Sequence, residues 1–254
     1  MNDILLYFAV KYEGDFEKIY YAIMNKEKCD YDEVVKVKKE IKCKYTTVIS
    51  NNYPKKLKHL NRPPFVIFYE GDLSLIDKTS LSVIGSRNNG EYGKIMCEKI
   101  VKELVDNNIV IISGLAKGID SIAHRVALKN HGKTIGVLGN GINYYYPKEN
   151  QDIQNEIKEY GLLISEYPPS LSPKKEYFPN RNRIIAALGD GLIVIEAKKR
   201  SGTMITVREA LDIGKEVMCV PTSALDNSGC NELIKNGAYL IEDANDVLEI
   251  LNIK

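Results

Sequence analysis

The densest group of phosphate-binding side-chain types in this chain lies in the segment Phe178-Pro179-Asn180-Arg181-Asn182-Arg183-Ile184-Ile185-Ala186. Guanidinium groups bind phosphate oxygens through two parallel hydrogen bonds, and side-chain amides add neutral donors. The segment therefore predicts a site for a phosphorylated ligand, made by Asn180, Arg181, Asn182 and Arg183. The alternative is that both arginines tie helix ends together or pair with carboxylates inside the fold.

Three glycine- and serine-containing turns each follow a short apolar run and precede an expected helix. Backbone N–H groups at the start of a helix have no partner within the helix, and they bind phosphate readily. We therefore expect phosphate contacts from the first turn (Gly85, Ser86, Arg87), the second turn (Gly114, Lys117) and the third turn (Ser201, Gly202, Thr203). In the second turn, Asp120 stands where a carboxylate caps a helix, so we expect it to be structural.

A fourth segment places Tyr144, Tyr145 and Tyr146 beside Lys148. Exposed aromatic rings bind bases of single-stranded nucleic acid, with about 1–3 kcal/mol per stacked base. Tyr146 precedes a proline, and we expect it to be buried in the core. Lys148 is the stronger candidate for a phosphate contact.

Apolar runs of four to six residues alternate with amphipathic stretches from residue 81 onward. Strands buried on both faces and joined by helices are typical of a parallel sheet. The pattern predicts an α/β fold: an extended Rossmann-like, doubly wound, mostly parallel sheet, which binds ligands beyond the carboxyl ends of its strands. The expected strands are 65–69, 81–85, 109–113, 134–138, 162–165, 191–195 and 217–221, and the expected helices are 92–107, 119–130, 150–160, 181–188, 204–213 and 230–236.

Residues 1–50 show helical periodicity and predict a small N-terminal helical segment, with the main domain over 51–254.

The 35 lysines and arginines and 34 acidic residues give a net charge of +1, which excludes a globally basic nucleic-acid binder but allows a local basic groove. The five cysteines form no CxxC pair, so we expect no disulfide, metal or cofactor. No apolar run approaches the ~20 residues of a membrane span, so we expect a cytoplasmic protein without membrane contact.

In order along the chain, the segments above resemble the motifs of the DprA/Smf family of DNA-processing proteins. The resemblance runs from about residue 53 to 241 and includes Val83-Ile84-Gly85-Ser86-Arg87, Tyr146-Pro147-Lys148-Glu149-Asn150 and Ser201-Gly202-Thr203, together with 113–124, 134–139, 165–169, 178–186, 194–197, 231–234 and 237–238.

The resemblance implies a protein that binds single-stranded DNA independently of sequence, protects incoming DNA during natural transformation and loads the RecA recombinase onto it. It also implies a homodimer. From the residues themselves we expect no enzymatic activity, because no Ser-His-Asp arrangement or metal-ligand cluster is evident. Arg87 and Lys148 match positions that bind DNA in the family, and Lys174 or Lys175 is a further match. The chain departs from the family in having Lys117 where many members carry arginine, and we expect no C-terminal winged-helix domain.

Two other classes of function remain open from the residues. The first is a nucleotide sensor or a phosphoribohydrolase-like enzyme of the same Rossmann group, in which Glu196 and Glu209 are the candidate acid and base. His124 is a weaker candidate base, and we expect it to be buried or capping. The second is an interaction module that binds RecA-like partners and little DNA. This alternative does not account for the three turns that are suited to binding phosphate.

Overall fold

The apolar runs after residue 80 form the parallel strands of one sheet. The computed structural model describes residues 1–253. In this part of the chain, nine strands lie in the order β1-β2-β6-β5-β4-β3-β7-β8-β9. Their bounds are β1 (Lys44–Thr47), β2 (Val66–Gly71), β3 (Ser80–Ile84), β4 (Val110–Ser113), β5 (Thr134–Leu138), β6 (Leu162–Ser165), β7 (Gly191–Val194), β8 (Val217–Cys219) and β9 (Tyr239–Leu240).

The strand order reverses at β3, which confirms the doubly wound topology. From β3 the chain adds β4, β5 and β6 in parallel on one side. It then returns to place β7, β8 and β9 in parallel on the other side. Beyond β6, β2 pairs antiparallel with β6 and β1 pairs antiparallel with β2, so among the described strands β2 alone runs in the opposite direction. The chain leaves the carboxyl ends of the neighbouring strands β3 and β7 in opposite directions, toward β4 and toward β8. A ligand crevice is expected between these two strand ends.

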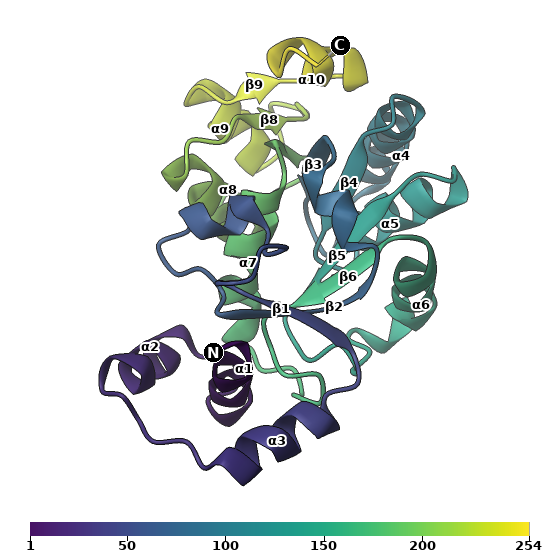
Figure 1. The fold of residues 1–254 in the computed structure, drawn as a ribbon. Helices are drawn as coiled ribbons and strands as arrows, with labels where there is room; N and C mark the ends of the chain where they lie inside the picture. The colour runs from purple at the N-terminus through teal and green to yellow at the C-terminus, as the bar shows by residue number, and fades with distance from the viewer. Residues whose placement is uncertain (254) are drawn as a thin grey trace.

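Helices cover both faces of this sheet (Figure 1). Buried side chains of α4, α5 and α10 pack with Leu81 and Ile193 on one face, where α6 also lies, while α7, α8 and α9 pack with Ile112 and Val194 on the other. The helix bounds are α4 (Glu91–Asp106), α5 (Ile119–Lys129), α6 (Gln151–Tyr160), α7 (Tyr177–Leu188), α8 (Thr203–Asp212), α9 (Gly229–Lys235) and α10 (Ala244–Ile250).

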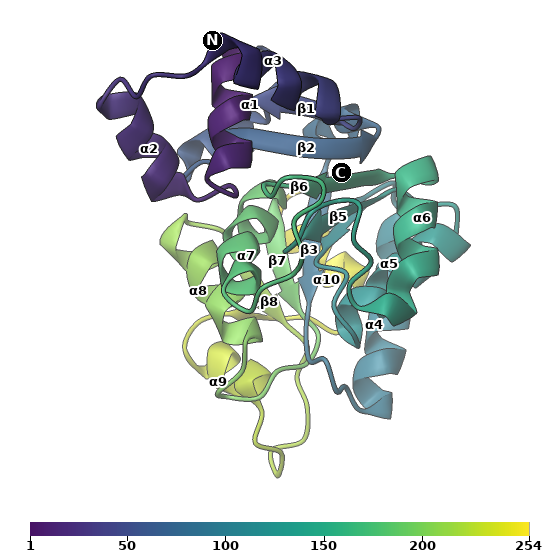
Figure 2. The ribbon, with the colours of Figure 1, turned by 90° about the horizontal axis from the view of Figure 1, so that it is seen from below.

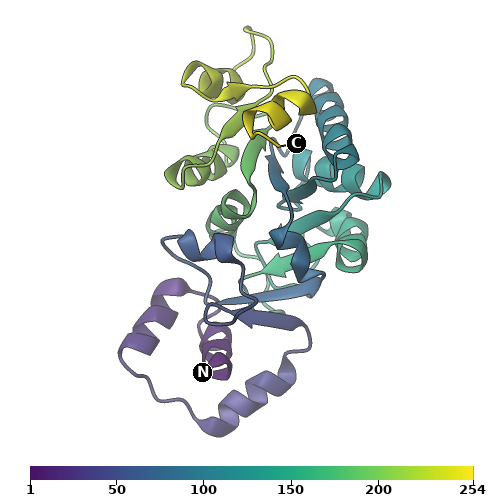
Figure 3. The ribbon, with the colours of Figure 1, turned by 45° about the horizontal axis from the view of Figure 1, so that its top comes forward.

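Three N-terminal helices lie together at one end of the molecule, opposite α9 (Figure 2) and opposite the C-terminal helix α10 (Figure 3). They are α1 (Asn2–Lys11), α2 (Phe16–Met24) and α3 (Tyr31–Glu40). Their apolar side chains pack against Val66 and Phe68 of β2. We expected this helical segment to extend to residue 50, but β1 pairs with β2 and so belongs to the sheet.

The expected strands and helices from residue 65 to 236 are confirmed, with one shift that matters for the site. Helix α7 begins at Tyr177 rather than at residue 181. Pro179 lies in its first turn, where a missing N–H group costs no helical hydrogen bond. Asn180, together with Phe178 and Pro179, therefore lies on the helix instead of in the turn before it. In the described residues, no helix is both long and apolar enough to cross a membrane.

His124 on α5 is fully buried against the sheet. Its Nδ1 lies 2.7 Å from the Oγ1 of Thr134, and that hydroxyl donates its own hydrogen to the Ile111 carbonyl oxygen at 2.7 Å. The Nδ1–H group therefore donates to Thr134, and Nε2 has no hydrogen-bond partner among residues 1–253. Burial lowers the pKa of His124 to about 3, so the imidazole is neutral in the folded protein.

This neutral imidazole makes stability depend on pH. In the unfolded chain a histidine binds a proton below pH ~6.5, whereas the folded protein does not until about pH 3. The free energy of unfolding should thus fall by about 1.4 kcal/mol for each pH unit between these values. Urea unfolding at pH 7.5 and pH 5.5 should show a smaller pH effect in His124→Gln than in the wild type. The exposed His59 is the control, and an equal reduction in His59→Gln would contradict the assignment.

Candidate functional site

A crevice of about 350 Å³ lies where the strand order reverses, at the carboxyl end of β3 and beside the start of α8. We call it the switch-point crevice. The first and third predicted turns both line it, which brings together residues more than 100 positions apart in sequence. Its polar lining includes Gly85, Ser86, Arg87, Arg181, Asn182, Ser201, Gly202 and Thr203.

The two turns are joined directly by a hydrogen bond. The Thr203 hydroxyl donates to the Gly85 carbonyl oxygen at 3.1 Å. Helix α8 begins at Thr203 with no side-chain hydrogen bond capping it, and the Ser201 Oγ is buried with no partner in the described residues. The Thr203 hydroxyl is engaged, whereas the Ser201 hydroxyl and the N–H groups of Gly202 and Thr203 have no partner among the described residues and can donate to an anionic ligand.

Arg87 supplies an exposed positive charge at this crevice. Within residues 1–253, no carboxylate oxygen lies within 4.0 Å of its guanidinium group. That group instead lies 6.0 Å from the centre of the Phe178 ring, a cation–π distance. The aromatic contact holds the side chain without neutralising its charge, which leaves Arg87 able to bind an anion.

Arg181 also lines the crevice, but its guanidinium group is engaged within the fold. The side chain is only 3% exposed, and Nη1 donates to the carbonyl oxygens of Gly114 (2.6 Å) and Val137. These carbonyls lie at the carboxyl ends of β4 and β5. Burial lowers the pKa of Arg181 to about 10, and the same burial raises the pKa of the nearby Asp120 carboxyl. These contacts agree with the alternative prediction, in which the arginine connects elements within the fold instead of binding a ligand.

The second predicted turn contributes Ala116 and Asp120 to the crevice, but Arg181 fills the space against Gly114. A side chain at Gly114 would place its Cβ 2.6 Å from the Arg181 Nη1. Glycine is thus required here for the close approach of the guanidinium group. Neither Gly114 nor Lys117 lines the switch-point crevice. Substituting Arg181 would consequently test folding as well as binding.

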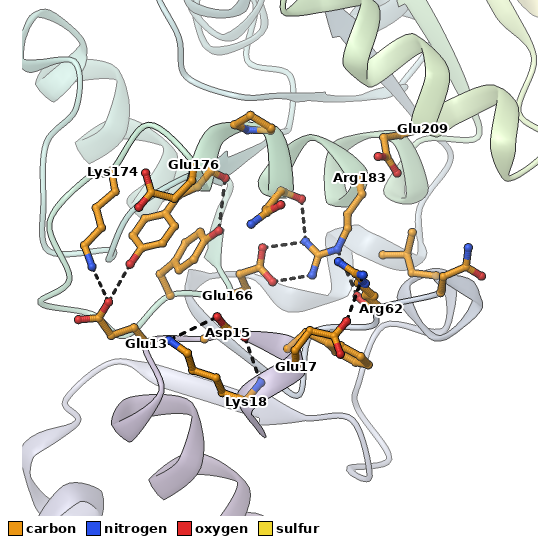
Figure 4. Close-up of a pocket in the computed structure, with 18 of the residues that line it drawn as sticks. Glu13, Asp15, Glu17, Lys18, Arg62, Glu166, Lys174, Glu176, Arg183 and Glu209 are labelled. Carbon is orange, nitrogen blue, oxygen red and sulfur yellow. Dashed lines mark hydrogen bonds and ion pairs between the residues drawn. The ribbon is translucent and has the colours of Figure 1, made fainter. Parts of the chain in front are cut away.

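Arg183 lies in a different cavity, and the prediction that it shares a pocket with Arg181 is wrong. Residues i and i+2 on a helix point about 200° apart. Arg183 lines a cleft of about 610 Å³ between α2 and α7, the N-terminal cleft (Figure 4). Its Nη1 and Nη2 donate to the Glu166 carboxylate at 2.7 and 2.6 Å. The paired side chains are 12% and 4% exposed, so this is a buried ion pair.

Four predicted lysines lie outside the switch-point crevice. Lys117 pairs with Glu149 at 2.5 Å, and Lys174 pairs with Glu13 at 2.6 Å (Figure 4). All four are exposed, but only Lys148 and Lys175 lack an ion pair with a described residue. Two of the four are therefore already neutralised by carboxylates. Asn180 is exposed and lines the N-terminal cleft, on the side of α7 that carries Arg183.

Sequence reasoning missed two aromatic features of the site. Phe178 lines the crevice, although the motif that contains it was read only for its amides and arginines. Tyr146 was expected in the core but is 47% exposed, with its ring centre 5.3 Å from that of Phe178. Lys198, which follows β7, is a further lining residue. Its position after a strand was a signal that could have identified it.

The candidate acid and base of the enzymatic alternative do not converge. The Glu196 carboxylate accepts a hydrogen bond at 2.9 Å from the N–H group of Gly90, the residue that precedes α4. Glu209 lines the N-terminal cleft instead. His124 is buried in the core. Within the part of the chain that is described, no group of three or more His, Cys, Asp or Glu residues is placed to hold a metal ion.

Comparison with known proteins gives consistent matches. The sequence matches the family described as DNA recombination-mediator protein A over residues 44–252. DNA processing protein DprA of Streptococcus pneumoniae (strain ATCC BAA-255 / R6) is 44% identical over 204 residues, which are 80% of this chain and 72% of that protein.

Two solved structures are also similar. The X-ray structure of DprA from Streptococcus pneumoniae has a TM-score of 0.83 and 34% identity, and the match covers 98% of this chain and 97% of that one. A DprA structure from Helicobacter pylori, described for its single-stranded DNA binding mode, has a TM-score of 0.75 and 32% identity, with 83% and 96% coverage. The pneumococcal match extends over the N-terminal helices, which precede the family match.

The buried pair of Arg183 and Glu166 gives a stability prediction. Removing one partner of a buried ion pair leaves an uncompensated charge and costs about 3–5 kcal/mol. Glu166→Ala should therefore lower the free energy of unfolding by about 3 kcal/mol, measured by urea denaturation. The matched control in the same cleft is the exposed pair of Glu17 and Arg62, 3.1 Å apart, for which Glu17→Ala should cost less than about 1 kcal/mol. Equal costs would contradict the assigned role of Arg183.

Proposed function

This chain belongs to the DprA/Smf family of DNA-processing proteins, and we propose that it binds single-stranded DNA at the switch-point crevice, without preference for sequence. The observation that carries the proposal is the combination of an unpaired, exposed Arg87 with the hydroxyl and backbone donors of two turns. Phosphate contacts position a strand but carry no information about its bases. The Helicobacter pylori relative, described for its single-stranded DNA binding mode, supports the choice of ligand.

The charges around the crevice set the strength of this binding. Arg87, Lys148 and Lys175 are available to phosphates at once. Lys117 and Lys174 must first exchange a carboxylate for a phosphate. In that exchange one charge-assisted hydrogen bond is lost when another forms. Each paired lysine therefore adds less to the affinity for DNA than an unpaired lysine does. Among the described residues, Arg87 and Lys198 are the exposed cations without an ion pair that line the crevice itself.

The family relationship supports a wider role that we include in the proposal. The protein protects incoming single strands during natural transformation and delivers them to the RecA recombinase, acting as a homodimer in the cytoplasm. We propose that it does so without catalysing a reaction. The hydrogen bond of Glu196 with the Gly90 N–H group and the separation of Glu209 from the crevice support a binding function over hydrolysis.

Removing the Arg87 charge tests the site. Arg87→Ala should weaken binding to a labelled oligo-dT about tenfold, because a hydrogen bond to a charged group contributes about 1.5–3 kcal/mol. The slope of log K against log salt should decrease in magnitude by about 0.7, the value for one phosphate of a single strand. Fluorescence anisotropy at several salt concentrations measures both quantities.

The control for this variant is Arg208→Ala, which removes an 85% exposed arginine from α8 outside the crevice. It should leave affinity within about twofold of the wild type. Unchanged affinity in folded Arg87→Ala would contradict the placement of the DNA. Failure of the wild type to bind oligo-dT would contradict the function itself and favour a small nucleotide as the ligand.

A further inference from the structure

The Tyr146 ring and the Arg87 guanidinium group both lie close to the ring of Phe178. Tyr146 follows β5, whereas Phe178 lies in the first turn of α7 and Arg87 follows β3. Phe178 contacts both of its neighbours: its ring lies 6.0 Å from the Arg87 guanidinium group and 5.3 Å from the Tyr146 ring. The three side chains therefore form a continuous row, which we call the aromatic row.

The position of this row is fixed by the ends of the strands. Phe178 packs directly over Gly139, where a Cβ would lie 2.7 Å from the Phe178 Cδ1. Gly139 is the first residue after β5. The row consequently extends from the crevice at β3 toward β5, along the same carboxyl edge of the sheet. Lys148, exposed and without an ion pair to a described residue, follows Tyr146 by two positions.

Tyr146 has no structural role comparable with that of the other paired tyrosines. Tyr167 and Tyr177 stack at 4.2 Å, are 3% and 8% exposed, and both donate their hydroxyl hydrogens to protein oxygens. Tyr146 is 47% exposed, and its hydroxyl makes no hydrogen bond within residues 1–253. An exposed ring that is held against a second ring is suited to stacking with a planar ligand.

We propose that one base of the bound strand stacks on the Tyr146 ring while the neighbouring phosphates contact Arg87 and Lys148. This inference rests on the proposed function, because the phosphates place the strand on this edge. The ligand of the Tyr146 subsite is a nucleobase of any identity, since every base presents a planar face. Phe178 supports the platform and also keeps the Arg87 guanidinium group in position.

An oligonucleotide with abasic residues separates base stacking from phosphate binding, because it keeps the phosphates and lacks the bases. Anisotropy with oligo-dT and an abasic oligomer of equal length should show that Tyr146→Ala binds oligo-dT about tenfold more weakly. Its affinity for the abasic oligomer should stay within twofold of the wild type, and Tyr146→Phe should behave as the wild type does. Tyr144→Ala, from the same loop and 42% exposed, is the matched control and should change neither affinity.

A spectroscopic measurement detects the stacking itself. The chain contains no tryptophan, so Tyr146→Trp introduces a single indole at the proposed platform. Oligo-dT should quench its fluorescence strongly, whereas the abasic oligomer should not, and Tyr144→Trp should respond to neither.

Equal losses on both oligomers, or no loss on oligo-dT, would overturn the stacking subsite while leaving the phosphate site of the proposed function intact. Absence of quenching in a Tyr146→Trp variant that still binds oligo-dT would also overturn it. If the wild type binds neither oligomer, the proposed function fails and the stacking subsite fails with it.

Discussion

The buried guanidinium group of Arg181 is the interaction on which the rest of the site depends. Arg181 lies on α7, and its guanidinium group donates hydrogen bonds to carbonyl oxygens at the carboxyl ends of β4 and β5. A charge buried this deeply is tolerated only when its hydrogen bonds are satisfied. Arg181 therefore fixes the first turns of α7 against the sheet edge, and Phe178, three residues earlier, acquires its position over β5 from the same anchor.

Much of the fold was predictable because both faces of a parallel sheet are covered by helices. Each central strand is then a short apolar run, and such runs are visible in the sequence. The three N-terminal helices follow a periodic pattern as well. Strand β9, with two residues, and β1, with a polar sequence, carry too little of this signal to be identified. Both obtain their structure from pairing with a neighbouring strand.

The site was predicted less completely than the fold. Turns after strands identify which backbone segments reach the carboxyl edge, and this placed Gly85 and Thr203 together. Side-chain direction is a different matter, because it depends on where a helix begins and on partners far away in sequence. Arg183 is separated from its partner Glu166 by 17 residues, and Arg181 from Gly114 by 67. Nothing in the local pattern distinguishes such arginines from ligand-binding ones.

Two lysines carry an internal counterion, because Lys174 is paired with the carboxylate of Glu13 and Lys117 with that of Glu149. A strand that displaces these carboxylates releases them into solvent on the protein surface, where they remain attached and close to the incoming phosphates. Fewer small ions are then liberated than the number of lysines in contact with the strand. A count of phosphate contacts derived from salt titration should therefore be smaller than a count made from the geometry of a complex, and the difference would report how many internal carboxylates had been exchanged.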